Sequence, residues 1–387
     1  MEMLFIVLNV ERKWINNMEV KIEKQNRLEY IDVAKFIAIF FVVLCHVMSK
    51  GEIRHIGYSF HLPLFFILNG VTLKIKDDES FGNFLEKKIK SYLIPIFCLG
   101  IILIFVEMIK FKLEGRVDDP KFFGTMLIKL LEQKRTYPIW FVGALFFSDI
   151  FFYFIVKIGK NKSYFVFIGG VLFLTVAIIF NIHYRYRFIW NIDVALFGVF
   201  FVCIGYLFAH KDFSKIREFL LGNRLYSLGI GIILFVLGQI LGEYNYHTYS
   251  SHLEMWGMNY NKYYLTIPCA VFSSLGIIFI SNSIRNKVMQ ELGKTTLVIL
   301  AFHQIVTIPL FNNVIAVTWF NSISSLSGDS IQYIFYCLVS SLFSIVCLVS
   351  VHYLIIYSPF AFILNKKIKP FYFKIYEKIK LSRRSNI

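Results

Sequence analysis

The sequence predicts an all-α, polytopic membrane protein: a bundle of about ten transmembrane helices with both termini in the cytoplasm. Of the 387 residues, 57% are hydrophobic and only 17% are charged, whereas soluble domains are nearer a quarter charged. The apolar residues gather in runs long enough to cross a bilayer. Lys and Arg (41) outnumber Asp and Glu (25) and cluster between those runs. An ordinary soluble enzyme and an intrinsically disordered chain are therefore excluded.

Charged clusters or polar loops separate most of the predicted spans. The last two are longer than a bilayer requires, so we expect them to tilt or to extend past it, and we expect Pro359 to end the final helix. The predicted spans are Tyr30–Met48, Ile56–Leu73, Ser91–Ile109, Tyr137–Val156, Ser163–Ile182, Phe188–Ala209, Leu225–Gly242, Tyr263–Ile284, Thr295–Phe320 and Ile331–Phe360.

A single transmembrane domain is predicted over residues 30–360, without an internal repeat. It follows a cytoplasmic segment, 1–29, in which Met18 could equally be the true start, and it precedes a basic cytoplasmic tail, 361–387. A cytoplasmic N-terminus places most Lys and Arg on the cytoplasmic side, as the positive-inside rule requires. The net charge of +16 is therefore chiefly an orientation signal, and no nucleic-acid partner is expected. The basic loop 110–137 is expected outside, on the membrane surface.

Ionisable side chains inside a span usually mark a functional site that faces the bundle interior. The first span contains Asp32, Lys35 and His46. At about 100° per residue, Lys35 and His46 are three turns and about 20° apart, and Asp32 lies within about 60° of both. All three share one stripe, with His46 about 16 Å further out. This geometry alone also allows an Asp32–Lys35 pair near the interface and a structural His46.

The second span places His61 near the same outer level as His46. Pro63 follows two residues later and is expected to loosen the first turn of that helix, a feature tolerated where a polar cavity is lined. The alternative is an interfacial histidine that caps the helix. The six cysteines lie in apolar runs without C-x-x-C spacing, so neither a metal site nor a disulfide framework is predicted.

Several motifs occur in a fixed order along the chain. They are Asp32-x-x-Lys35 with His46, Phe60-His61-x-Pro63 with Asn69-Gly70, Phe84–Lys90 with Ile94-Pro95, Pro138–Phe146, Trp190–Asp193 with Phe201–Tyr206, and Leu292–Leu297 with Phe302-His303. The ordered set resembles the acyltransferase 3 family of integral membrane acyltransferases, which includes bacterial O-acetyltransferases of cell-surface polysaccharides and a fucose 4-O-acetylase-like branch. Two positions depart from the family: Asn69 replaces a more usual serine, and Lys88 a more usual arginine.

The resemblance implies transfer of an acetyl or other short acyl group from cytoplasmic acyl-CoA, acetyl-CoA in the first instance, to a hydroxyl of a cell-surface glycan or its lipid-linked precursor. The enzyme would reside in the bacterial cytoplasmic (inner) membrane as a multi-pass protein. Acyl-CoA would be a substrate, with no bound cofactor. Whether transfer is direct or passes through an acyl-enzyme is left open.

The resemblance also implies roles for individual residues. His46 is expected to be the general base, and His61 or Asn69 is expected to stabilise the oxyanion or orient the sugar. Asp32 is expected to set the charge state of Lys35. The implied catalytic residues are His46, His61 and Asp32, and the implied binding residues are Lys35, Asn69, Lys88, Trp140 and His303. Lys35 and Lys88, with Lys87 and Lys90, are the candidates for the CoA phosphates, and Glu107, Asp149 and Asp193 are further candidates for the site in general. Lys87 and Lys90 could equally be positive-inside loop charge, and His303 could equally form a structural hydrogen bond between helices.

Two other function classes use buried ionisable residues. A transporter or flippase could use Asp32, Lys35 and His46 for ion coupling, and it predicts repeated, interrupted helices. A sugar-polymerising membrane enzyme predicts large outer loops with acidic or arginine clusters. Neither pattern is visible in the sequence.

Overall fold

The computed structural model describes residues 29–113, 115, 121–135, 137–184, 186–249, 254–323 and 325–366. Within this part of the chain every regular element is a helix and no strand occurs, so the predicted all-α class is confirmed. The predicted N-terminal segment and basic tail fall almost wholly outside the described residues.

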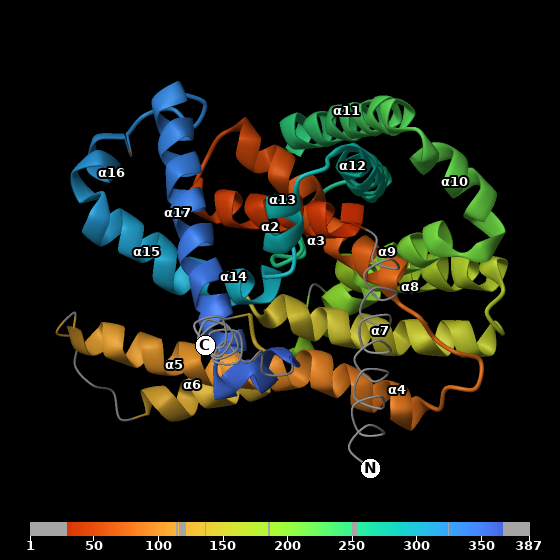
Figure 1. Cartoon of the computed structure of the whole chain (residues 1–387), viewed down its shortest axis with the longest axis horizontal. Coiled ribbons are helices and arrows are strands. Elements are labelled where there is room, and N and C mark those ends of the chain that lie inside the picture. Colours follow the sequence, from red (N-terminus) through yellow and green to blue (C-terminus); the bar gives the residue numbers. More distant parts are fainter. Residues whose placement is uncertain are drawn as a thin grey trace, which may run out of the picture.

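The helices follow one another along the chain with mostly short connections (Figure 1). The α-helices are α2 (Glu29–Val47), α3 (Glu52–Thr72), α4 (Phe81–Lys88), α5 (Ile94–Leu113), α6 (Phe122–Leu131), α7 (Trp140–Ile158), α8 (Ser163–His183), α9 (Ile192–Ala209), α10 (Ser214–Gly222), α11 (Arg224–Tyr249), α12 (Tyr263–Ser283), α13 (Lys287–Leu292), α14 (Thr296–Phe302), α15 (Ile308–Leu310), α16 (Val317–Ile323) and α17 (Ile331–Ile356). The π-helical segments are η1 (Ile89–Leu93), η4 (His303–Thr307) and η5 (Phe311–Ile315), and the 3₁₀ segments are η2 (Ile189–Asn191), η3 (Lys211–Phe213) and η6 (Pro359–Leu364).

Nine helices in the described residues are long and apolar enough to cross a membrane. The second predicted span lies in α3, which has 21 residues but is not among the nine. Its histidines and Asn69 lower its hydropathy, and much of its surface is buried against other helices rather than exposed to lipid. The chain is therefore a multi-pass, all-α membrane bundle in which α3 is an interior helix.

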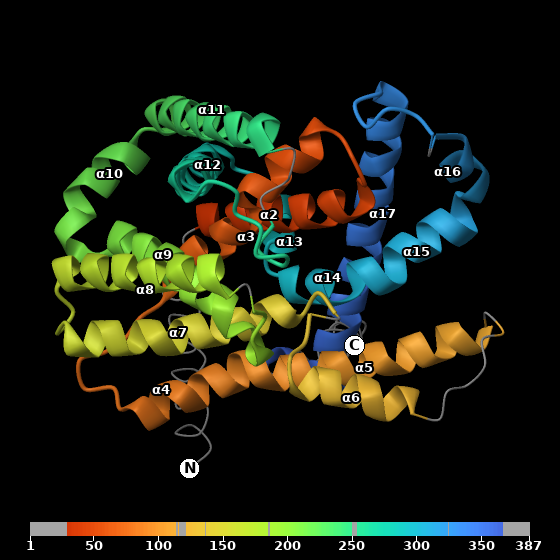
Figure 2. The same ribbon diagram turned by 180° about the vertical axis from the view of Figure 1, so that it is seen from behind.

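The two helices with the candidate catalytic histidines, α2 and α3, lie at the centre of the bundle (Figures 1 and 2). Helices α9 and α12 pack against α3, while α12, α13, α14 and α17 pack against α2. Helices α11 and α8 lie further out and expose many large apolar side chains. Polar residues on α2 and α3 are thereby shielded from lipid.

Close backbone contacts fix the position of α3 against α9. A Cβ on Gly70 would lie 2.1 Å from the carbonyl oxygen of Val202, and one on Gly205 would lie 1.9 Å from that of Ile67. Only glycine allows two helices to approach so closely, and such small-residue contacts are a common way to join helices in membranes. These contacts place Asn69 and His61 at defined depths in the bundle.

Several predicted boundaries were wrong. The third span begins not at Ser91 but at Phe81, because α4, η1 and α5 form one run of helix, in which Ser80 caps the start by accepting a hydrogen bond from Asn83 N at 3.3 Å. Pro63 lies well inside α3, which starts at Glu52, so it does not loosen a first turn and His61 does not cap the helix. Helix α17 ends at Ile356, before Pro359 begins the 3₁₀ segment η6.

The ninth predicted span, Thr295–Phe320, is not one over-long tilted helix. It is interrupted by the π-helical segments η4 and η5, and α16 begins as a separate helix at Val317. A π-helical turn widens the helix by one residue and is frequent at functional sites. His303 is the first residue of η4.

Candidate active site

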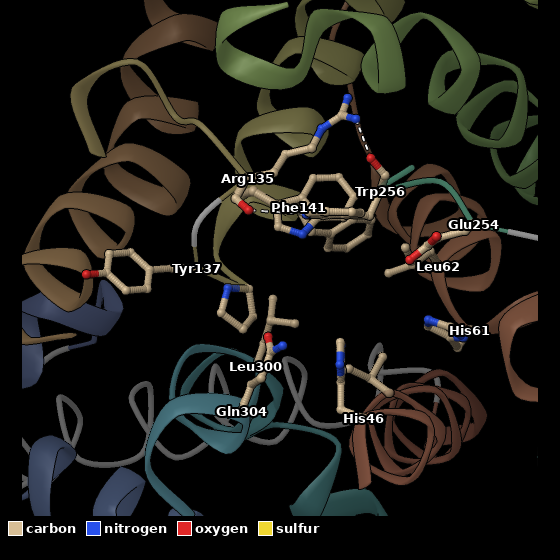
Figure 3. Close-up of a pocket in the computed structure, with 13 residues that line it drawn as sticks. His46, His61, Leu62, Arg135, Tyr137, Phe141, Glu254, Trp256, Leu300 and Gln304 are labelled. Atoms are coloured by element: carbon tan, nitrogen blue, oxygen red, sulfur yellow. Dashed lines mark hydrogen bonds between the residues drawn. The ribbon is translucent and has the colours of Figure 1, made fainter. Parts of the chain in front are cut away.

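A cavity of about 340 Å³ opens beside the C-terminal end of α2 and the N-terminal half of α3 (Figure 3). We call it the outer cavity, because the sequence predicts that this side of the bundle faces outward. His46 from α2 and His61 from α3 line it, as do Trp140 and Phe141 from the start of α7. Arg135, Glu254 and Trp256 line it from two loops, and Gln304 from η4. Three predicted site residues, His46, His61 and Trp140, are thus brought together although they lie on three different helices.

His46 is exposed to this cavity even though α2 lies in the bundle interior. Its imidazole ring lies 5.0 Å, centroid to centroid, from that of His303, which is fully buried. His303 therefore packs against the candidate base but does not itself line the cavity.

Hydrogen bonds to backbone carbonyls fix the protonation sites of two rings. Nδ1 of His61 lies 2.6 Å from the carbonyl oxygen of Gly57, and Nδ1 of His303 lies 2.9 Å from that of Ile299. A carbonyl oxygen can only accept, so each Nδ1 must carry the hydrogen and donate. In the neutral rings Nε2 is then the acceptor. Nε2 of His303 is buried and has no partner among the described residues.

A second cavity of about 210 Å³, the inner cavity, lies on the side of Phe141 and Leu300 away from the histidines. Lys35 and Asn69 line it, and so does Tyr92 of η1. Phe141 and Leu300 line both cavities, so these two side chains form the wall between them. Lys35 and His46 share the predicted stripe of α2, but they open into different cavities.

A buried polar cluster lies beside the inner cavity. Nζ of Lys88 is 2.6 Å from a carboxylate oxygen of Asp149, whose side chain is wholly buried. The same carboxylate accepts hydrogen bonds from Asn69 Nδ2 at 2.6 Å and from the Tyr92 hydroxyl at 3.0 Å. The charge of Lys88 is therefore already compensated within the protein, and Asp149 holds Asn69 in place.

Arg135 is a site residue that we do not predict from the sequence, because it lies in the basic loop 110–137 that is expected on the membrane surface. Its side chain is in fact only 5% exposed and forms an ion pair with Asp193 of α9. Its Nε donates to Asn191 Oδ1 at 2.9 Å, and its Nη1 donates to the carbonyl oxygen of Trp256. Two features of the sequence nevertheless point to Arg135. It lies just before the Trp140-Phe141 motif, and Asp193 is an acidic residue inside a predicted span that needs a cationic partner.

The Trp190–Asp193 motif supports this arrangement through an unusual backbone. Trp190 and Asn191 both have positive φ angles, 62° and 56°. The left-handed conformation is costly for a residue as bulky as tryptophan and is retained where surrounding contacts enforce it. Here Asn191 Nδ2 donates to the carbonyl oxygens of Gln133, at 2.9 Å, and Trp140, at 3.1 Å. The motif thus holds the segment before α7 against the start of α9.

The remaining candidates take other places. Asp32 is buried but lines neither cavity; its carbonyl oxygen would lie 1.9 Å from a Cβ on Gly293, which explains why a glycine is needed at the end of α13. Glu107 accepts a hydrogen bond from the Tyr137 hydroxyl at 2.6 Å. Burial, followed by this hydrogen bond, raises the pKa of Tyr137, which therefore stays neutral at physiological pH. The exposed side chain of Lys87 pairs with the buried carboxylate of Glu79, and Lys90 pairs with Glu86 at the protein surface.

The two adjoining cavities together present two imidazoles, from His46 and His61, the amine of Lys35 and the amides of Asn69 and Gln304. No group of three His, Cys, Asp or Glu side chains suited to a metal ion occurs among the described residues. The inner cavity offers Lys35 and Asn69 to an anionic or amide-bearing ligand, and the outer cavity offers His46 as a base to a hydroxyl.

Comparison with known proteins identifies the relationship. No curated protein and no solved structure matches the chain. Residues 28–366 match the family model Acyl_transf_3, described as an acyltransferase domain. This match spans all the helices of the bundle and both cavities. The chain belongs to the acyltransferase 3 family and is a membrane acyltransferase.

Proposed function

We propose that this membrane acyltransferase moves an acetyl group from acetyl-CoA at the cytoplasmic face to a hydroxyl of a cell-surface glycan or its lipid-linked precursor, with His46 as the general base. The observation that carries the proposal is the position of His46. It opens into a polar cavity inside the bundle, next to His61, and a buried histidine supports it from behind.

In this mechanism, His46 takes the proton of the acceptor hydroxyl as the oxygen attacks the thioester carbonyl. A carbon–oxygen bond forms, the carbonyl becomes a tetrahedral oxyanion, and its collapse breaks the carbon–sulfur bond. The thiolate of CoA leaves and takes up the proton from His46. The products are the O-acetyl ester and CoA, so atoms and charge balance.

The surrounding residues have distinct tasks in this proposal. The buried ring of His303, 5.0 Å from that of His46 between centroids, packs against it and so orients it. Nδ1 of His303 is used by the backbone, and its Nε2 is the atom that would accept a hydrogen bond from His46 when the substrates are bound. Asn69, held by Asp149, positions the acyl-donor end through its amide. Trp140 and Phe141 exclude water from the reacting atoms.

The two adjoining cavities suggest how a cytoplasmic donor reaches His46. The pantetheine arm of acetyl-CoA would extend through the inner cavity past Lys35, and its thioester would lie at the wall formed by Phe141 and Leu300. The acceptor would enter the outer cavity from the other side. Donor and acceptor then meet at one point, which favours direct transfer over an acyl-enzyme relay.

The proposal is tested by comparing cell-surface glycans from a deletion strain with those from strains carrying wild-type or His46→Ala protein. Alkali-labile acetate should be lost in the deletion strain, restored by the wild type and not restored by His46→Ala. An unchanged acetate content in the deletion strain would overturn the proposed activity. Full restoration by His46→Ala would remove only the assignment of the base.

A transporter or flippase is the alternative, and the interrupted Thr296–Ile315 span is the feature it could use. It predicts that deletion alters the amount of glycan at the cell surface but not the O-acetyl content per sugar. The same glycan analysis therefore separates the two functions.

A further inference from the structure

We propose that Glu254 and Trp256 form the acceptor-binding wall of the outer cavity, and that this wall binds a neutral pyranose with two vicinal free hydroxyls. The inference rests on the proposed function and names the acceptor more closely. Neither residue belongs to the motifs that carry the family resemblance.

Backbone hydrogen bonds and buried side chains hold the segment that carries both residues in a defined conformation. Glu254 and Asn259 exchange two backbone hydrogen bonds of 2.9 Å, which close a tight turn. Met255, Met258 and Tyr260 are buried beneath it, and the ring of Tyr260 stacks on Phe197 of α9 at 4.3 Å. The turn is therefore anchored on the bundle.

Reciprocal hydrogen bonds attach the turn to Arg135. Trp256 Nε1 donates to the carbonyl oxygen of Arg135 at 3.2 Å, and the Arg135 guanidinium donates to the carbonyl oxygen of Trp256. Asp193 pairs with that guanidinium from α9. The turn, the segment before α7 and the start of α9 are thus joined at one point on the rim of the outer cavity.

Two side chains from this turn face the cavity (Figure 3). The indole of Trp256 is 39% exposed while its N–H is occupied by Arg135, so its apolar ring surface remains for contact with a ligand. Arg187 lies over one face of the ring, 4.6 Å from its centroid, so the opposite face is the one that would contact a ligand. An aromatic ring of this kind packs well against the C–H groups of a sugar.

Glu254 supplies the polar half of the recognition. An ionised carboxylate only accepts hydrogen bonds, and its two oxygens can accept from two neighbouring hydroxyls at once. The same negative charge repels the carboxylates and phosphates of acidic glycans. Two cations lie near the wall. Arg135 is neutralised by Asp193, and Arg187 lies over the Trp256 ring without an ion pair to Glu254 among the described residues, so the charge of Glu254 is not cancelled by either. The wall therefore favours a neutral sugar.

The acceptor-binding wall and the candidate base, His46, line the same cavity. Glu254 and His61 lie on the same side of the cavity, and His46 faces it from below in Figure 3. A pyranose held by Glu254 and Trp256 would present a further hydroxyl toward His46. The wall thus selects the acceptor while leaving the donor side untouched.

The test measures two properties of each variant, which is produced in the deletion strain. One is equilibrium binding of radiolabelled acetyl-CoA to the solubilised, purified full-length protein; the other is transfer of label to alkali-labile esters of the glycan in the membranes. We expect Glu254→Gln and Trp256→Ala to lower transfer by about tenfold or more, because charged hydrogen bonds and stacking are lost, while acetyl-CoA binding stays at the wild-type level. Trp256→Phe should recover part of the transfer.

Glu243→Gln is the matched control, since Glu243 is a partly exposed carboxylate of α11 that lines neither the outer nor the inner cavity. Wild-type transfer in both wall variants would overturn the inference. Loss of acetyl-CoA binding in either would also overturn it, because the wall would then not be specific to the acceptor. Mass spectrometry of the labelled sugar should find a neutral pyranose, and an acidic sugar would contradict the assignment. Absence of transfer and of acetyl-CoA binding in the wild type would instead refute the proposed function.

Discussion

The imidazole rings of His46 and His303 lie 5.0 Å apart, one at the end of α2 and the other at the first residue of η4. Nδ1 of His303 donates to the backbone, and Nε2 has no hydrogen-bond partner among the described residues, so it is the atom available to accept from His46. A buried acceptor with no other partner is costly unless it is used. The pair is therefore the structural basis of the proposed general base.

Replacing His303 should impair transfer without removing the base. We expect His303→Leu to lower the rate of acetyl transfer by about a hundredfold, because His46 loses the group that orients it. His303→Asn, whose side-chain oxygen can still accept, should retain more activity than His303→Leu. Radiolabelled acetyl-CoA transfer in membranes measures both, with His183→Asn, an exposed position at the end of α8, as control. A wild-type rate in His303→Leu would contradict the role of this pair.

The buried ion pair between Lys88 and Asp149 gives a prediction on stability. Lys88→Met leaves the fully buried carboxylate of Asp149 without its cation, and we expect a loss of about 3–5 kcal/mol in the free energy of unfolding. Lys88→Arg should retain most of the stability, since a guanidinium also pairs with the carboxylate. Denaturant titration of the detergent-solubilised protein provides the measurement.

Lys90→Met is the matched control, because the Lys90–Glu86 pair is more than half exposed. That variant should change the free energy of unfolding by at most about 1 kcal/mol. Equal losses of unfolding free energy in Lys88→Met and Lys90→Met would show that the buried Lys88–Asp149 pair stabilises the fold no more than an exposed pair does.

The Arg135–Asp193 pair should support the outer cavity. Asp193→Asn leaves a buried guanidinium partly unpaired, so we expect lower thermal stability and reduced acetyl transfer together. Arg135→Lys should also reduce acetyl transfer. One ammonium cannot replace the planar group that contacts Asn191, Asp193 and Trp256. Thermal unfolding and transfer assays on the same preparations test this. Full activity in Arg135→Lys would show that only charge is needed.

The close approach of α3 and α9 can be tested with a single methyl group. Gly70→Ala places Cβ 2.1 Å from a backbone oxygen of α9, so α3 must shift. We expect a loss of about 1–3 kcal/mol and weaker transfer, because Asn69 and His61 move with the helix. Gly82→Ala on α4 is the control, since no atom lies within 4 Å of the added Cβ. A stable, active Gly70→Ala protein would contradict this account of the interface.

Glu79, in the loop before α4, gives a prediction on pH. A hydrogen bond from Lys87 at 2.6 Å lowers the pKa of the Glu79 carboxyl in the folded protein. Because the pKa of Glu79 is lower in the folded than in the unfolded protein, the ionised carboxylate stabilises the fold at pH values above the unfolded pKa of about 4.3. This contribution is lost as the pH falls through the folded pKa. Acidification below pH about 4 should therefore destabilise the wild type more than Glu79→Gln. Parallel thermal unfolding curves for the two proteins across this pH range would contradict the prediction.

Local sequence was a good guide to the helices and to part of the site. Apolar runs predicted the spans because a bilayer demands about 20 apolar residues per helix. Histidine spacing on α2 and α3 predicted that His46 and His61 would lie at one level, and both do line the same cavity. Asp32 lines neither cavity, because α13 packs on that end of α2.

Interruptions and loops could not be predicted in the same way. A π-helical turn such as η4 depends on packing around one helix, which composition does not encode. Arg135 looked like loop charge because its partners, Asp193 and the carbonyl of Trp256, are far away in the sequence. The turn that carries Glu254 and Trp256 offered no periodic pattern at all.

By itself, the sequence determined that this chain is an all-α membrane protein of the acyltransferase 3 family, because hydropathy and ordered motifs are local properties of the chain. Only the tertiary structure decided which polar residues share a cavity. It set His303 behind His46, divided the site at Phe141 and Leu300, and brought Glu254 and Trp256 to the outer rim. The physical reason is that helix packing, through contacts such as that of Gly70 with α9, fixes depth and rotation, and neither is written in any single segment.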